Sequence, residues 1–147
     1  MSKFTTQLRV RHYEMDALGH VNNAVYQHYL EQAAIEHSEQ VGFTLDRYQE
    51  IGGAFVLRRM AIEYLRPAVA GNTLTVTTWL EEMRGTRATR HYEIHGQNQE
   101  LLVTATALWV WVATEGLQGN RASMRPRPIP AELLAAFTAL QQTEAHA

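Results

Sequence analysis

The sequence has 147 residues, of which 46% are hydrophobic and 19% are charged, and its formal net charge is -2. This length fits one domain, and a chain of this size buries roughly 70% of the surface that its unfolded form exposes. The absence of cysteine excludes disulfides, thiolate catalysis and cysteine-ligated zinc. The slightly negative charge argues against nucleic acid as a partner, because phosphate binding usually needs a basic surface.

The first ten residues, MSKFTTQLRV, contain no long apolar stretch. We therefore expect no signal peptide and a cytoplasmic location. No apolar run reaches the length of a membrane span, since Thr104 and Thr106 interrupt the longest candidate. We expect no membrane partner, and we treat residues 1–147 as a single domain whose tail, residues 115–147, is its least certain part.

Apolar and polar residues alternate over residues 4–12, which predicts a first strand. From about residue 24 the apolar residues recur with helical spacing, which predicts a helix of about 18 residues, near 27 Å long. Asn22 or Asn23 is a suitable N-cap for this helix, and Gly42 is a suitable stop. The predicted apolar stripe consists of Tyr26, Tyr29, Leu30, Ala33, His37 and Val41.

Four further strands are predicted after a loop that contains Gly52 and Gly53. A short amphipathic helix is then expected near the C-terminus. One long helix and a run of antiparallel strands predict an α+β domain in which the helix covers one face of the sheet. A second subunit could cover the other face. The strands are expected at residues 54–65, 73–80, 86–95 and 101–114, and the helix at residues 131–140.

Several enzyme classes lack their motifs in this chain, which has no serine in a G-x-S-x-G elbow, no phosphate-binding loop and no G-x-G-x-x-G. His91 and His95 share one face of a predicted strand at a spacing of about 13 Å, which is too far for one metal ion. We interpret them as half-exposed strand residues, and we expect neither a metal nor a cofactor.

The stretch YEMDALGHVNNAVYQHYLEQAA, residues 13–34, places the carboxylate of Asp16 in a loop just ahead of the long helix. A loop carboxylate can act as a nucleophile or a general base. The first helical turn has N–H groups without internal partners, and these favour an oxygen that gains negative charge. Thioester hydrolysis requires such a pair. The alternative is that Asp16 is only a turn or capping residue.

This stretch resembles the signature of hotdog-fold acyl-CoA thioesterases, within them the 4-hydroxybenzoyl-CoA thioesterase-like group that includes bacterial long-chain acyl-CoA thioesterases. A second block, IEYLRPAVAGNTLTV at residues 62–76, resembles the strand-turn-strand of that family. The resemblance implies a hotdog fold, a long helix wrapped by a five- or six-stranded antiparallel sheet. It also implies a dimer or homotetramer with active sites between subunits. The matching positions are Asp16, Gly19, His20, Val21, Asn22, Asn23, Tyr26, Tyr29, Leu30 and Glu31.

The resemblance also implies roles for the residues of the motif. Asp16 would attack the thioester carbonyl or activate water, and the backbone N–H of Asn23 would polarise that carbonyl. Gly19 would allow a tight turn or a close approach of the backbone. His20 would orient Asp16 or line the site, with a packed or capping role as the alternative.

Further residues are candidates for substrate binding. Tyr26 is more readily a core residue, and Glu31 is either an auxiliary base or an ion-paired helix residue. Coenzyme A carries phosphates, so a basic patch is expected, and the acyl group needs an apolar slot. The binding candidates are Asn22, Tyr26, Glu31, Arg59, Arg84 and Arg87, with Arg90, Arg121, Arg125 and Arg127 as further basic residues. The slot candidates are Phe55, Val56, Leu57, Met60 and Trp79.

The expected function is that of an acyl-CoA thioesterase in lipid metabolism, which hydrolyses an acyl-CoA to a free acid and coenzyme A. A fatty acyl group is favoured over an aromatic one, and a thioester of acyl carrier protein stays open as the substrate. Two other functions also stay open. One is a dehydratase of 3-hydroxyacyl thioesters with His20 and Glu31 as its acid-base pair. The other is a module that binds acyl-CoA without turnover.

Overall fold

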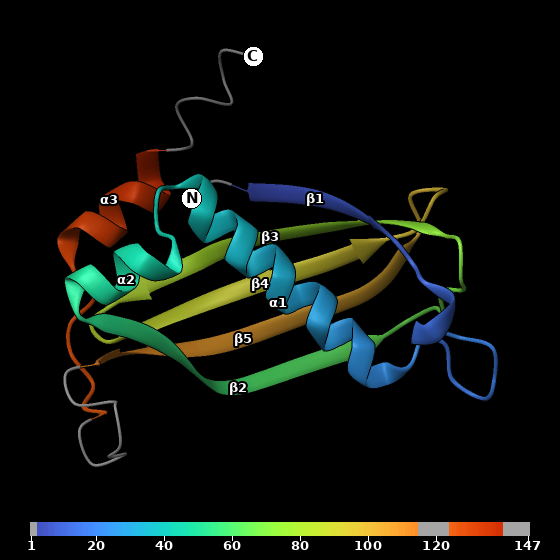
Figure 1. Ribbon diagram of the computed structural model, residues 1–147, viewed down its shortest axis with the longest axis horizontal. Helices are drawn as coiled ribbons and strands as arrows, with labels where there is room; N and C mark the ends of the chain where they lie inside the picture. Colours follow the sequence, from blue (N-terminus) through green and yellow to red (C-terminus); the bar gives the residue numbers. More distant parts are fainter. Residues whose placement is uncertain (1–2, 115–123, 140–147) are drawn as a thin grey trace.

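The computed structural model describes residues 3–114 and 124–139, in which five strands form one antiparallel sheet (Figure 1). The strand order is β1-β3-β4-β5-β2, so β1 and β2 form the two edges. The predicted α+β class is therefore confirmed, with five strands. They are β1 (Lys3–Arg9), β2 (Gly53–Tyr64), β3 (Thr73–Arg84), β4 (Arg87–His95) and β5 (Leu101–Ala113).

The long helix α1 (Asn23–Gln40) crosses one face of the sheet (Figure 1). Asn22 is its N-cap, and the chain leaves the helix at Gly42, whose φ of 93° lies in the left-handed region. Five of the six residues of the predicted stripe are buried, from Tyr26 to His37. The predicted helix is thus confirmed, because its apolar stripe packs on the sheet.

The apolar side chains between helices and sheet form two clusters. The first cluster includes Tyr29 and Leu30 of α1, which pack with strand residues such as Val76. The second includes Phe43 and Trp111, with side chains from the C-terminal part of the chain. Two shorter helices lie at the end of the sheet where this second cluster is found (Figure 1). They are α2 (Leu45–Ile51) and α3 (Ala131–Ala139).

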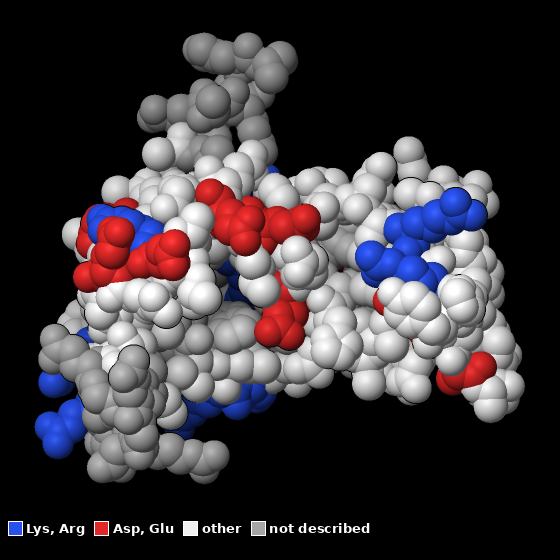
Figure 2. Space-filling view, in the orientation of Figure 1, with Lys and Arg blue, Asp and Glu red and all other residues white. Residues whose placement is uncertain are grey.

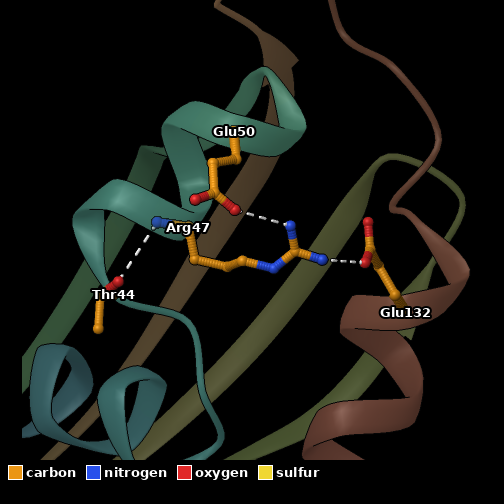
Figure 3. Close-up of polar contacts among 4 residues, drawn as sticks. All are labelled: Thr44, Arg47, Glu50 and Glu132. Carbon is orange, nitrogen blue, oxygen red and sulfur yellow. Dashed lines mark hydrogen bonds and ion pairs between the residues drawn. The ribbon is translucent and has the colours of Figure 1, made fainter.

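Helix α2 is absent from the elements that the sequence predicts, which place a loop in this region. Its seven residues are too few to show a helical period, and none of them is buried. Thr44 caps the helix by accepting from the Arg47 N–H at 3.3 Å, and Gly52 ends it with a φ of 72°. Arg47 also joins α2 to α3 through Glu132, at 2.6 Å (Figure 3).

Two strand boundaries differ from the prediction by more than one residue. β1 ends at Arg9, and a 3-10 turn, η1 (His12–Glu14), follows it. β3 continues to Arg84, past a register shift between Leu80 and Glu82 that breaks the alternation used for the prediction. The helix α3 agrees with its prediction within the described residues, since residue 140 lies outside them.

Among the residues that the structure describes, no helix combines the length and the apolar character needed to cross a membrane.

Candidate active site

The loop ahead of α1 is closed into a compact turn by backbone hydrogen bonds. Met15 and Val21 form an isolated antiparallel bridge, inside which the Asp16 N–H donates to the His20 carbonyl at 2.7 Å. Gly19 has a φ of 78°, a conformation that glycine adopts without strain. The local sequence therefore places Asp16 at the start of a tight turn, a few residues before the helix begins.

The Asp16 carboxylate is half-buried and is held through one of its two oxygens. Oδ1 accepts hydrogen bonds from the N–H groups of Leu18 at 2.9 Å and His20 at 3.2 Å. Oδ2 forms no hydrogen bond with any residue in the described part of the chain. Asp16 is therefore a capping residue of its own loop, as the alternative interpretation predicts, and still presents a free oxygen.

The first turn of α1 presents an unpaired amide. The Asn22 side chain accepts from the Ala24 N–H at 2.9 Å, and the Val25 N–H donates to the Asn22 carbonyl at 2.9 Å. The Asn23 N–H forms no hydrogen bond within residues 3–114 and 124–139. An unpaired amide at a helix N-terminus favours an oxygen that develops negative charge.

Asp16 lies close enough to the first turn of α1 for its charge to affect Tyr26. Burial raises the pKa of the Tyr26 hydroxyl, and the charges of Tyr64 and Asp16 add to that rise, while a hydrogen bond from Ala68 lowers it. This hydroxyl accepts from the Ala68 N–H at 3.1 Å, and the Tyr26 ring belongs to the first apolar cluster. The structure thus gives Tyr26 a packing role beside the loop.

Glu14 holds the loop against the core, although no pattern in the sequence marks it as a site residue. Its Oε1 accepts from the Arg11 N–H at 2.7 Å and from the Tyr29 hydroxyl at 2.9 Å. Burial, followed by the bond to Glu14, raises the pKa of Tyr29. The Asn22 N–H also donates to the Glu14 carbonyl at 2.9 Å. Glu14 therefore ties the loop to the core side of α1. The one sequence signal for this role is that Glu14 lies two residues before Asp16.

His20 and Glu31 do not lie together. His20 is exposed, and its ring forms no hydrogen bond with the described residues. Glu31 is exposed on α1, eight positions after Asn23, which is about 12 Å along the helix. Its side chain lines a cavity farther along α1. The pair that a dehydratase would need therefore finds no support in this arrangement.

The structure does not bring the basic candidates to Asp16. Arg84 and Arg87 face each other at the turn between β3 and β4. The start of β3 pairs with the end of β1, next to the Asp16 loop, so its other end lies roughly 36 Å away at 3.3 Å per residue. Arg59 is exposed on the edge strand β2, and Arg121 lies outside the described residues.

A cavity of about 440 Å³ lies between the C-terminal half of α1, the two short helices and the sheet. Of the residues considered for an apolar slot, Phe55 lines this cavity, whereas Leu57 and Met60 pack against the first cluster. Trp79, another slot candidate, does not line this cavity. Its ring stacks on His91 at 5.5 Å on the opposite face of the sheet. Arg90 was expected on the surface, but it is 5% exposed and lies in the cavity wall.

The strand histidines are half-buried, as expected, and each lies near a carboxylate. His91 pairs with Glu81 at 2.6 Å, and His95 lies 3.9 Å from Glu93. Within the described ranges, no group of three or more potential ligands gathers at a metal-binding distance.

A long helix across an antiparallel sheet, with a carboxylate in the loop ahead of that helix, is the arrangement expected of a hotdog-fold thioesterase. The comparison with known families agrees with this class. The family model described as the thioesterase-like superfamily matches residues 10–137. The chain therefore belongs to this family of hotdog-fold thioester hydrolases.

Two curated relatives show how the family resemblance extends along the chain. Acyl-CoA thioester hydrolase YbgC of Escherichia coli O6:H1 is 31% identical over 134 residues, which cover 91% of this chain and 95% of the relative. Acyl-acyl carrier protein thioesterase ATL3 of Arabidopsis thaliana is 31% identical over 142 residues, which cover 93% of this chain and 69% of the relative.

Solved structures share the fold. A putative oleoyl thioesterase from Lactobacillus plantarum superposes with a TM-score of 0.84 at 22% identity, and the match covers 93% of this chain. The chain spans 51% of that protein. A thioesterase from Thermus thermophilus, complexed with coenzyme A and zinc, has a TM-score of 0.77 at 27% identity and covers 95% and 94% of the two chains.

Proposed function

We propose that the protein hydrolyses acyl thioesters of coenzyme A or of acyl carrier protein, with Asp16 as its catalytic carboxylate. One observation carries this proposal. Asp16 keeps Oδ2 free while Oδ1 is fixed by two amides, and the Asn23 amide at the start of α1 is unpaired. The loop thus offers a carboxylate oxygen and an N–H donor at the same end of one helix.

The chemistry follows from these two groups. The thioester oxygen accepts from the Asn23 N–H, so the negative charge that develops on it meets the positive end of the helix dipole. Oδ2 of Asp16 then attacks the carbonyl carbon, the C–S bond breaks, and the thiolate leaves and takes up a proton. Water hydrolyses the resulting mixed anhydride. In the alternative path, Oδ2 removes a proton from water, and the hydroxide attacks the same carbon.

The test replaces Asp16 with Asn, which keeps an oxygen for the amides of Leu18 and His20. We expect Asp16→Asn to lower kcat by at least about 100-fold, because its neutral amide neither attacks nor accepts a proton. Asp46→Asn is the matched control, since Asp46 is exposed in the first turn of α2. Wild-type turnover by Asp16→Asn, with the melting temperature unchanged, would end the proposal.

We further propose that the protein works as a homo-oligomer, a dimer or a tetramer. Several large apolar side chains are exposed near the Asp16 loop and the end of β2, among them Leu18 at 81% and Leu65 at 51%. β2 is also an unpaired edge of twelve residues. A partner subunit would cover these groups and could bring its basic residues to the site. Light scattering would test this, and a monomer at micromolar concentration would contradict it.

The acyl group is proposed to be fatty rather than aromatic, since the cavity of about 440 Å³ beside α1 is mostly apolar. A panel of acyl-CoA and acyl carrier protein thioesters, varied in chain length and ring content, would test this preference. The expected cytoplasmic location stays a prediction.

A further inference from the structure

The cavity beside α1 has apolar walls but one cationic residue. Figure 2 shows the face of the molecule that α1 crosses, with acidic side chains gathered over the helix. Glu31 and Glu39 lie at the cavity and are exposed, whereas Arg90 lines it and is buried. The apolar lining includes Ile35, Phe43, Phe55, Leu80, Trp109 and Phe137.

Arg90 has only neutral partners. Its Nη1 donates to His37 Nδ1 at 2.9 Å and to Thr78 Oγ1 at 3.1 Å, and the guanidinium lies 5.8 Å from the centre of the Phe137 ring. No carboxylate among the described residues forms an ion pair with it. Nε and Nη2 form no hydrogen bond with those residues.

Such an arrangement is costly for a purely structural arginine. Buried charges are usually paired with an opposite charge, because the loss of water is otherwise poorly compensated. Burial lowers the pKa of Arg90, but a guanidinium remains protonated in a protein. His37 is neutral, because burial and the Arg90 charge lower its pKa to about 3. Arg90 is therefore a fixed cation whose remaining N–H groups lack an acceptor among the described residues.

The rim of the cavity limits what that acceptor can be. Glu31 and Glu39 form the rim of the cavity. A ligand that carried a carboxylate into the cavity would pass these two charges, and repulsion between like charges would oppose its entry. A hydroxyl or keto oxygen carries no net charge, so Glu31 and Glu39 would not repel it. Such an oxygen still accepts a hydrogen bond from the guanidinium of Arg90.

We propose that the cavity binds the acyl group of the substrate and that Arg90 selects acyl chains that carry a neutral oxygen near their far end. This inference rests on the proposed thioester hydrolysis and names the substrate class of that site. Glu31, at the rim, lies about 12 Å along α1 from its first residue. The acyl group must therefore be of medium or long chain length to reach Arg90 from the first turn of the helix.

The test measures binding without turnover. The probes are thioether analogues of acyl-CoA, which the enzyme cannot hydrolyse. Their chains have the dodecanoyl or the hexadecanoyl length, and at each length the far end of the chain is a methyl, a hydroxyl or a carboxylate group. By titration calorimetry we expect the hydroxyl-ended analogue to bind roughly tenfold more tightly than the methyl-ended one at one or both lengths. If the wild-type protein bound the hydroxyl-ended and methyl-ended analogues equally tightly at both lengths, this result by itself would overturn the inference.

Two variants locate the effect. Arg90→Gln keeps an amide donor but loses the charge, and we expect the preference for the hydroxyl to fall to near unity while the methyl-ended analogue binds as before. A preference that survives in folded Arg90→Gln would contradict the role of Arg90. The double variant Glu31→Gln with Glu39→Gln changes only exposed side chains, so it should fold. We expect it to raise the affinity for the carboxylate-ended analogue several-fold, and an unchanged affinity would contradict the role of the rim.

The two proposals fail separately. Asp16→Asn should keep the preference for the hydroxyl-ended analogue, because Asp16 does not line the cavity. If no thioester were hydrolysed but the preference persisted, the hydrolase would be wrong and the binding site would stand. If hydrolysis occurred with no preference in binding, the inference about Arg90 would be wrong and the hydrolase would stand.

Discussion

We expect His37 to make the stability of the fold depend on pH. The residue is 1% exposed, and burial together with the charge of Arg90 lowers its pKa to about 3, from an ordinary value of 6.5. Between these two values, the unfolded chain binds a proton at His37 and the folded protein does not. Stability from this residue is therefore fully present above pH 6.5 and falls as the pH falls toward 3.

The size of the effect follows from the same two pKa values. At pH 5 the pH lies 1.5 units below the ordinary value of 6.5, and each unit corresponds to about 1.4 kcal/mol. His37 should therefore lower the free energy of unfolding by about 2 kcal/mol between pH 7 and pH 5. This is a sizeable part of the roughly 5–15 kcal/mol by which folded domains are usually stable.

Urea denaturation at pH 7 and pH 5 would measure this difference, and His37→Gln is the matched variant. Glutamine offers Arg90 an oxygen acceptor in place of Nδ1 and does not titrate. Other groups contribute equally to the pH dependence of both proteins, so the comparison isolates His37. We expect the wild-type protein to lose about 2 kcal/mol more than the variant between the two pH values. Equal losses would refute the assignment of His37 as a buried neutral residue.

Three further substitutions, one of them with a matched control, test the packing and the surface ion pairs. Gly53→Ala should destabilise the fold by about 1–3 kcal/mol in denaturant titrations, because its Cβ would overlap the Trp111 ring; wild-type stability would contradict the close approach. Leu30→Ala should cost about 2–5 kcal/mol, since Leu30 is fully buried, whereas the exposed Leu45→Ala should change stability by less than about 0.5 kcal/mol. Arg47→Gln removes two exposed ion pairs (Figure 3) and should cost at most about 1 kcal/mol in the same assay, and a larger loss would show that α3 depends on this contact.

The sequence predicts those elements whose side chains repeat over several turns or strand pairs. The stripe of α1 has enough residues to define its helical period, and four buried positions alternate along β3 from Leu74 to Leu80. Helix α2 is missed because seven residues without a buried side chain leave no period to recognise. β3 is predicted too short because a register shift after Leu80 breaks the alternation.

The residues of the candidate site also divide into those placed by local sequence and those placed by long-range packing. The placement of Asp16 just ahead of the first turn of α1 could be predicted from sequence because the loop and the helix start are adjacent in the chain, and the catalytic roles of Asp16 and Asn23 stay a proposal. Glu14 is missed, since its partner Tyr29 lies fifteen positions away and the bond between them depends on how α1 packs. Arg90 is misplaced on the surface for the same reason. Its surroundings come from α1, β3 and the C-terminal helix, whose meeting no local pattern records.

Phe137 belongs to α3, outside the five-stranded sheet, yet it forms part of the wall around Arg90. Because α3 packs on the second apolar cluster and takes no part in the pairing of the strands, relatives could lengthen, shorten or reshape this helix without disturbing the sheet. The depth of the cavity around Arg90 could therefore diverge among relatives while the Asp16 turn, built on the opposite cluster, stays the same.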